Sequence, residues 1–221
     1  MSSTKSILPV MLSSFCLMLG LIGNCGVNAE NQLMVQVYYE TLCPDSIRFI
    51  CTEFYNSMKE NGRLEFTDLK FIPYGKVSSW TNPTTNVTIL YCQHGETECE
   101  LNALHACIVE NNSPTEQLDL INCLLRYNNH NIDVCAEKLK IDVSKAKTCK
   151  ATRSTPDILK KYGDMTDLID LTFVPSIAFD NNFDPWDQDQ YRFNFDKAFC
   201  KQYKKKFDVN LQNCPNNRKL N

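Results

Sequence analysis

The chain has 221 residues, of which 43% are hydrophobic and 22% are charged, and its formal net charge is −3. This length is enough for one domain with a real core, and the slight acidic excess gives no support for a nucleic-acid partner. Beyond the first 29 residues no segment is long and apolar enough to cross a bilayer, so we expect no membrane span in the mature protein.

The first 29 residues have the pattern of a secretory signal peptide. Lys5 precedes a mostly apolar stretch from Ile7 to Gly23, and Val27-Asn28-Ala29 ends in a small-x-small cleavage pattern. A membrane anchor is the alternative, but the apolar stretch is short and is interrupted by two serines. We therefore expect a signal peptide at residues 1–29 and one domain at residues 30–221.

Ten of the twelve cysteines lie beyond this segment. In the secretory route, structural disulfides are the expected state of most of them. Glycosylation sequons begin at Asn86 and Asn111 and agree with that route, although Pro114 weakens the second.

The first half of the domain has the pattern of a strand–helix–strand unit. Leu33 to Glu40 is rich in β-formers and predicts a buried strand. Pro44 suits the first position of a helix, and apolar residues recur at helical spacing until Asn61-Gly62. Leu64 to Tyr74 predicts a second strand.

The middle of the chain is predicted to be a loop followed by helices. Residues 75–91 are polar and predict an exposed loop. From Cys92 to about Gly163 the apolar spacing is helical, and six cysteines lie within this stretch. Short helices are marginal without tertiary support, so we expect a disulfide-rich helical insertion at about residues 92–163.

Strand character returns near the C-terminus. Leu171 to Phe179 predicts a strand, Asp180-Asn181-Asn182 predicts a hairpin turn, and Phe183 to Trp186 would pair back weakly. A last helix is expected from Gln190 to about Phe207. The predicted class is α/β, in the order β-α-β, helical insertion, β-β-α.

Cys43 lies where the first strand meets the first helix. A thiol at a helix N-terminus is stabilised as the thiolate, which is the nucleophile in disulfide exchange. Asp45 in the same turn would oppose this by raising the thiol pKa. A structural cysteine is the alternative interpretation.

Val174-Pro175 is the second candidate feature, because proline at the start of a strand either terminates pairing or adopts a cis bond. An ordinary trans proline at an edge strand is the alternative. In thioredoxin-like folds, a cis-proline loop faces the active cysteine and presents the backbone of the preceding residue to an extended substrate.

Residues 92–107 read CQHGETECELNALHAC. Their cysteines and histidines could hold zinc, but the spacing lacks paired C-x-x-C knuckles and the secretory route favours disulfides, so we expect no metal. The segment resembles the signature of the gamma-interferon-inducible lysosomal thiol reductase family, C-Q-H-G-x-x-E-C-x-x-N-x-x-x-x-C. Eight positions match: Cys92, Gln93, His94, Gly95, Glu98, Cys99, Asn102 and Cys107.

The resemblance extends over the mature chain through YYETLC (38–43), IPYG (72–75) and FVPS (173–176). It implies a thioredoxin-like fold with a helical insertion, and reduction of disulfides in unfolding proteins within endosomes or lysosomes. It also implies that Cys43 is the nucleophile and that Ser46 occupies the position of the resolving cysteine. There this sequence departs from the family's C-x-x-C pattern.

A serine at position 46 cannot expel a substrate from a mixed disulfide with Cys43. Release would then need a thiol from the substrate or from a small external reductant, and no other cofactor is expected. Cys51 lies eight residues along the same helix, roughly 12 Å away, which is too far for a bridge. If Cys43 and Cys51 are free, four disulfides can form among Cys92, Cys99, Cys107, Cys123, Cys135, Cys149, Cys200 and Cys214, in a pairing that the sequence leaves open.

Three functions remain open. The leading one is a secreted or endolysosomal thiol–disulfide oxidoreductase with a single nucleophilic cysteine and weakened reductase activity, acting on disulfide-containing or unfolded proteins with small thiols. The alternatives are a secreted pseudo-enzyme that binds partners or modulates immunity, and a saposin-like lipid binder, which would leave the β elements unexplained. We expect His94 and His105 to orient or pack this region, and Trp80 and Trp186 to be packing residues.

Overall fold

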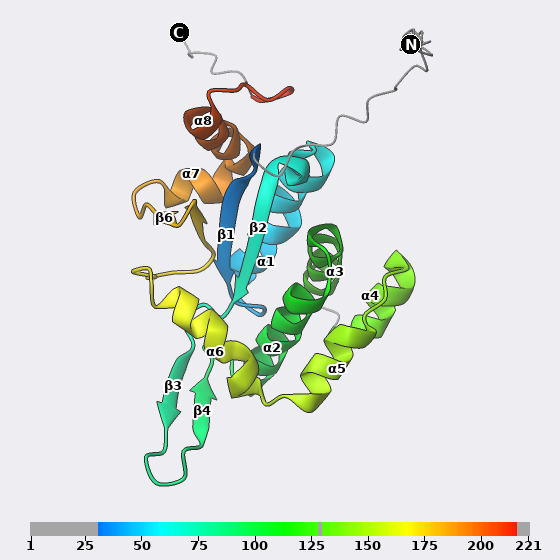
Figure 1. Ribbon diagram of the computed structural model, residues 1–221, viewed down its shortest axis with the longest axis vertical. Coiled ribbons are helices and arrows are strands. Elements are labelled where there is room, and N and C mark those ends of the chain that lie inside the picture. The colour runs from blue at the N-terminus through cyan, green and yellow to red at the C-terminus, as the bar shows by residue number, and fades with distance from the viewer. Residues whose placement is uncertain (1–30, 128–129, 216–221) are drawn as a thin grey trace, which may run out of the picture.

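The computed structural model describes residues 31–127 and 130–215, so the expected signal peptide lies outside the described residues. Within these ranges no helix is both long enough and apolar enough to cross a membrane. The chain has a mixed α/β architecture in which a small sheet stands beside a group of helices (Figure 1).

The central sheet has four strands in the order β2-β1-β5-β6. The strands are β1 (Leu33–Tyr39), β2 (Thr67–Pro73), β5 (Ser176–Phe179) and β6 (Asn182–Phe183). β1 pairs in parallel with β2 and antiparallel with β5, and β6 pairs antiparallel with β5. β1 is therefore an inner strand, and its nearly continuous apolar sequence matches its burial on both faces.

The helix after β1 makes the crossover that a parallel pair requires. It begins as α1 (Pro44–Phe49) and continues as π-helical segments at Ile50–Phe54 and Asn56–Glu60. Phe54 packs between the sheet and the C-terminal helix, with its ring centroid 5.6 Å from Phe71 and 5.0 Å from Phe195. The strand predicted to start at Leu64 starts at Thr67, because residues 63–66 form a short 3₁₀ helix instead.

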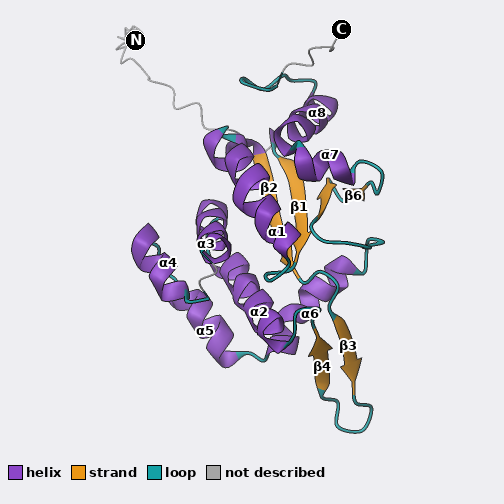
Figure 2. Cartoon of the chain, turned by 180° about the vertical axis from the view of Figure 1, so that it is seen from behind, coloured by secondary structure: helices purple, strands orange, loops and turns teal. Residues whose placement is uncertain are grey.

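Residues 75–91 do not form the predicted loop. They contain a two-stranded hairpin, β3 (Ser78–Thr81) and β4 (Thr88–Tyr91), which projects from the body of the molecule (Figures 1 and 2). Hydroxyl, β-branched and aromatic side chains in both strands favour pairing over a loop. Trp80 on this hairpin is 49% exposed and Trp186 is 91% exposed, so the prediction that both are packing residues is wrong.

Five helices follow the hairpin: α2 (Glu96–Asn111), α3 (Pro114–Arg126), α4 (Ile132–Leu139), α5 (Ser144–Thr152) and α6 (Thr155–Thr166). Disulfides connect α2 to α5 through Cys107–Cys149, and α3 to α4 through Cys123–Cys135. Buried residues of these helices belong to the same hydrophobic core as the sheet. The helical region is therefore part of one core rather than an appended module.

The C-terminal third differs from the prediction in two places. The strand predicted from Leu171 is paired only from Ser176, after Pro175, whose missing N–H cannot join a ladder. The predicted last helix is two helices, α7 (Gln188–Phe193) and α8 (Phe195–Phe207), separated at Asn194. The hairpin turn between β5 and β6 is as predicted, with positive φ at Asp180 and Asn181.

A buried arginine of the 3₁₀ helix before β2 binds the C-terminal segment. Arg63 is 2% exposed and donates from Nε to Asp196 Oδ1 at 2.8 Å. Its other nitrogens donate to the carbonyl oxygens of Gln212 (2.8 Å) and Asn213 (3.0 Å). The Cys200–Cys214 disulfide closes the same segment onto α8.

Candidate active site

Cys43 is the N-cap residue of α1, where the loop after β1 enters the helix. Its thiol is free and partly exposed, and its Sγ lies 3.8 Å from the carbonyl oxygen of Val174. The Val174–Pro175 peptide bond is cis. The structure therefore brings together two sequence features that are 131 residues apart.

Two side chains of opposite charge lie near the thiol. The carboxylate of Asp45, which we expected to oppose a thiolate, forms an exposed ion pair with Arg48 at 3.0 Å. A groove of about 100 Å³ lies beside this ion pair and is lined in part by Arg48, Phe49 and Pro175. It also includes Arg192, whose guanidinium lies 4.4 Å from the ring centroid of Phe173.

Ser46 lies one turn into α1 and is fully buried. Its hydroxyl oxygen accepts a hydrogen bond from the backbone N–H of Glu40 at 3.4 Å. Ser46 therefore stabilises the base of the loop that presents Cys43.

The loop before Cys43 is held by two fully buried side chains of α2. Asn102 Oδ1 accepts from both the backbone N–H and the hydroxyl of Thr41, at 3.0 and 2.8 Å. Glu98 Oε2 accepts from the backbone N–H of Leu42 at 3.3 Å. The segment 92–107 thus holds residues 40–42 in place, the reactive loop that leads to Cys43.

Glu98 also holds His94 and lies close to a second buried carboxylate. His94 donates its backbone N–H to Glu98 Oε1 at 3.1 Å, and its Nδ1 lies 2.6 Å from Glu98 Oε2. Glu40 is fully buried at the end of β1, and burial raises the pKa of its carboxyl group. The backbone N–H of Lys76 donates to Glu40 Oε1 at 2.7 Å and opposes that rise.

Gly75 makes room for Glu40. Its φ is +61°, and a Cβ atom built on it would lie 2.3 Å from Glu40 Cγ. A side chain at this position would therefore displace the buried carboxylate. This explains the glycine that ends the IPYG stretch, for which the sequence offered no local reason.

The other nine cysteines of residues 31–127 and 130–215 are one free thiol and four disulfides. Cys51 is free and buried, its Sγ lies 3.8 Å from the carbonyl oxygen of Asn122, and burial raises its pKa to about 11. The other eight form four disulfides: Cys92–Cys99, Cys107–Cys149, Cys123–Cys135 and Cys200–Cys214. Because Cys92, Cys99 and Cys107 are in disulfides, they offer no thiolate ligands for the zinc site considered for residues 92–107.

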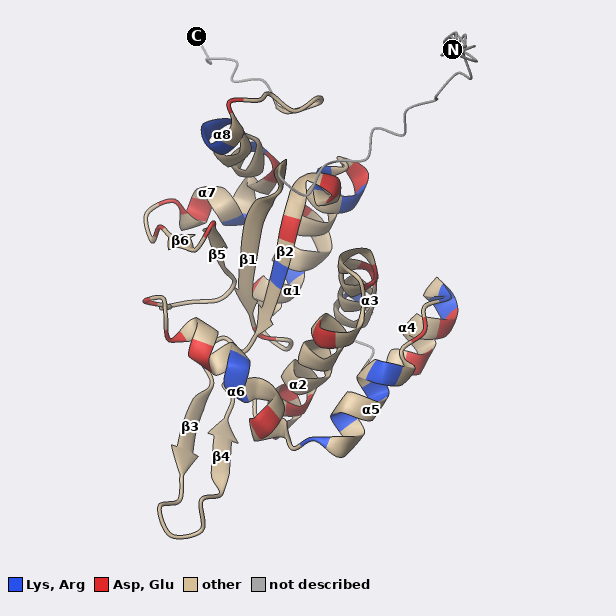
Figure 3. Cartoon of the chain, viewed as in Figure 1, with Lys and Arg blue, Asp and Glu red and all other residues tan. Residues whose placement is uncertain are grey.

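The other residues singled out in the sequence lie away from the thiol or serve packing. His105 is buried, its Nδ1 lies 2.9 Å from the hydroxyl of Tyr39, and burial lowers its pKa to about 3. Asn86 is exposed in the turn of the β3–β4 hairpin, whereas the side chain of Asn111 donates to the carbonyl oxygen of Cys107. The basic run 204–206 lies at the end of α8 (Figure 3).

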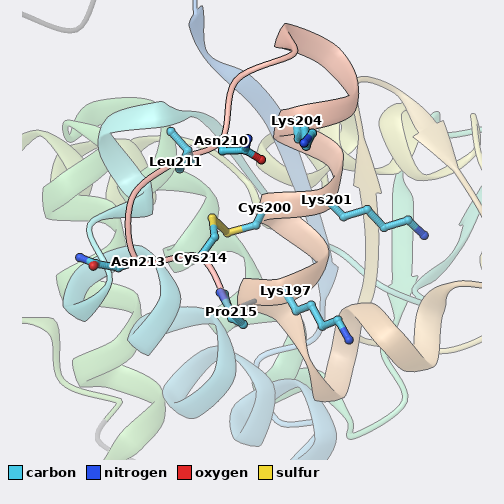
Figure 4. A pocket seen from close by; sticks show the side chains of 9 residues that line it. All are labelled: Lys197, Cys200, Lys201, Lys204, Asn210, Leu211, Asn213, Cys214 and Pro215. Carbon is cyan, nitrogen blue, oxygen red and sulfur yellow. A yellow bond between two sulfur atoms is a disulfide. The ribbon is translucent and has the colours of Figure 1, made fainter. Parts of the chain in front are cut away.

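A second hollow, of about 560 Å³, lies against α8 and contains the Cys200–Cys214 disulfide (Figure 4). Lys197 and Lys201 point outward from the helix there rather than toward the disulfide (Figure 4). Neither of its cysteines is a free thiol, so the hollow offers no nucleophile.

The residues that support this site have no distinct signal in the sequence. Glu98 and Asn102 stand out there only as matching positions of the family signature, and Glu40 only as the last residue of a predicted strand. A glutamate that ends an otherwise apolar buried strand is a signal that could have identified Glu40, since buried charges need partners.

Comparison with known proteins agrees with this arrangement. The family model described as "Gamma interferon inducible lysosomal thiol reductase (GILT)" matches residues 34–139. The chain is 41% identical to "GILT-like protein 2" of Drosophila melanogaster over 90% of this chain and 96% of that protein. It is 34% identical to the "Gamma-interferon-inducible lysosomal thiol reductase-like protein" of Anopheles gambiae over 78% of this chain and 77% of that protein.

Proposed function

The chain belongs to the gamma-interferon-inducible lysosomal thiol reductase family, and on that premise we propose that it is a thiol–disulfide oxidoreductase that attacks protein disulfides through Cys43. The observation that carries the proposal is the free, partly exposed thiol at the start of α1, 3.8 Å from the Val174 carbonyl oxygen. The parallel β1–β2 pair with antiparallel β5 and β6 supports a thioredoxin-like core. A substrate strand would lie along the 173–176 loop.

The reaction has two steps. The Cys43 thiolate attacks one sulfur of a substrate disulfide, a mixed disulfide forms, and the departing substrate thiolate takes a proton from solvent. A thiolate from the substrate or from a small external reductant then attacks the mixed disulfide. If the thiolate comes from the substrate, Cys43 leaves and a substrate disulfide re-forms, which is isomerisation. If an external thiolate attacks the substrate sulfur, Cys43 leaves and the reductant stays joined to the substrate until a second reductant molecule frees the substrate thiol and forms the reductant disulfide. Both routes restore Cys43 without a bound cofactor.

Ser46 limits the second step. Its buried hydroxyl hydrogen-bonds the loop and cannot displace a sulfur. We propose that turnover is weaker than with a C-x-x-C pair and depends on the concentration of external thiol. Disulfide-containing or unfolded proteins, and small thiols, are the proposed partners.

The proposed compartment follows from the leader and the disulfides. A signal peptide at residues 1–29 would direct a single domain, residues 30–221 with a helical insertion near 92–163, into the secretory route. Four disulfides are stable there, and the family name points to lysosomes. Asn86, exposed on its hairpin, is the better placed glycosylation site.

A protein that keeps the site but only binds its partners is the second candidate, favoured by the serine at position 46. Insulin reduction measured at acidic and neutral pH, with a small thiol as reductant, separates the two functions. We expect turnover that rises with thiol concentration, is lost in Cys43→Ser and is retained in Cys51→Ala. Absence of turnover in the wild-type protein at every thiol concentration would favour the binding function.

A further inference from the structure

Three side chains next to the reactive loop converge on one point. Glu40 comes from the end of β1, His94 from the loop before α2, and Glu98 from the first turn of α2. Each offers a ligand atom, and these atoms lie within 4.8 Å of one another. Both glutamates are fully buried, whereas the side chain of His94 is 38% exposed, which leaves a path from solvent.

The two buried carboxylates lack a strong cationic partner. Among the described residues, the ion pairs of Glu40 and Glu98 involve only His94, at 3.7 and 2.6 Å. A buried carboxylate is costly unless it is paired or coordinates a metal. A second positive charge at this point would offset the cost.

One oxygen at the cluster has no hydrogen-bond partner among the residues that the structure describes. Glu40 Oε2 is buried and makes no hydrogen bond, although it lies 3.7 Å from His94 Nδ1. The Lys76 N–H holds the other oxygen, so it fixes the carboxylate with Oε2 turned toward the cluster. Backbone N–H groups also orient Glu98, with His94 donating to Oε1 and Leu42 to Oε2, the oxygen that faces the His94 ring. Such outer hydrogen bonds are typical of metal ligands.

We propose that Glu40, His94 and Glu98 bind one divalent cation, with zinc the best match to two carboxylates and an imidazole. Zinc ligands at about 2.0–2.2 Å in a tetrahedron are separated by roughly 3.4 Å. The present separations from His94 Nδ1, 2.6 Å to Glu98 and 3.7 Å to Glu40, bracket that value. The cation replaces the proton between His94 and Glu98, which is released to solvent, and water completes the coordination.

A cation at this point would connect the residue that begins the reactive loop to α2. Glu40 lies three residues before Cys43, and no thiol takes part in the site. Binding is therefore independent of the redox function proposed above, and either can fail without the other.

Calorimetric titration of the purified mature protein with ZnCl₂ at neutral pH tests the proposal. We expect one zinc per chain in the wild-type protein, and at least tenfold weaker binding in Glu40→Gln and in His94→Ala. Glu96→Gln removes an exposed carboxylate of the same helix turn and should bind as the wild type does. Cys43→Ser should also bind normally, because the thiol is not a ligand.

In the titration, any of three results would overturn the proposal: no zinc binding to the wild-type protein, unchanged affinity in Glu40→Gln and His94→Ala, or loss of binding in Cys43→Ser. Zinc-edge X-ray absorption of the loaded wild-type protein gives an answer even if the variants do not fold. Only nitrogen and oxygen neighbours at about 2.0–2.2 Å are expected. A sulfur shell would refute the assignment.

Discussion

Replacing Ser46 with cysteine isolates the step that we propose to be limiting. Position 46 is the third residue of α1 and Cys43 is its N-cap, so their Cα atoms are about 5 Å apart in helical geometry. Disulfides span Cα separations of roughly 4.4–6.8 Å, so the two thiols can bond without a change of fold. The substitution weakens the hydrogen bond from the Glu40 N–H, since sulfur is a weak acceptor, at a cost of about 1 kcal/mol.

The gain in rate comes from proximity. Thiols joined by short flexible linkers meet at millimolar effective concentrations, and a helical turn holds two residues closer than such a linker does. With an external thiol at about 1 mM, we therefore expect the mixed disulfide to resolve at least roughly tenfold faster in Ser46→Cys.

The assay follows release of a protein substrate from the mixed disulfide, by non-reducing electrophoresis and intact mass after acid quenching. The wild-type protein should accumulate the adduct on Cys43, whereas Ser46→Cys should release it, and Ser46→Ala serves as the matched control without a thiol. Equal adduct lifetimes in Ser46→Cys and Ser46→Ala would refute the proximity argument. Another feature of the groove would then limit turnover.

Three further predictions concern single groups. Iodoacetamide at pH 8 should label Cys43 but not Cys51, whose pKa of about 11 leaves only about a thousandth of it as thiolate; equal labelling in a peptide map would contradict this. Asn102→Ala removes the acceptor shared by the Thr41 N–H and hydroxyl groups and should lower the free energy of unfolding by about 1–3 kcal/mol in urea, whereas the exposed control Glu96→Gln should stay within about 0.5 kcal/mol. Burial lowers the pKa of His105 to about 3, so between this value and about 6.5 only the unfolded chain takes up the proton. Stability should therefore fall with decreasing pH, by up to about 1.4 kcal/mol per unit, and urea denaturation at pH 4.5 and 7 should show a smaller fall in His105→Gln.

The sequence was sufficient for features that depend on local pattern. Neighbouring residues in the sequence determine three of these features: the apolar strand β1, the start of α1 at its proline, and the turn at Asp180-Asn181. The family resemblance is confirmed because it rests on many spaced positions at once.

Features that depend on distant partners could not be predicted. The segment 75–91 predicts a loop because most of its residues are polar, and the pairing of its two short strands is visible only once they are aligned. Glu98 and Asn102 bind backbone atoms 56 and 61 residues away, so nothing beside them in the sequence shows their role. The break at Asn194 lies within a continuous helical pattern and is likewise invisible there.

Arg63 has a consequence for how the protein is made. The carbonyl oxygens that it binds belong to residues 149 and 150 positions further along the chain. At about 5–20 residues per second, they leave the ribosome roughly 8–30 s after Arg63 does. Until then this guanidinium cannot be fully paired in the interior, and a buried charge without its partner is strongly destabilising. The β1–β2 half therefore completes its packing only when the end of the chain arrives, together with Cys214, whose disulfide with Cys200 closes the same segment onto α8.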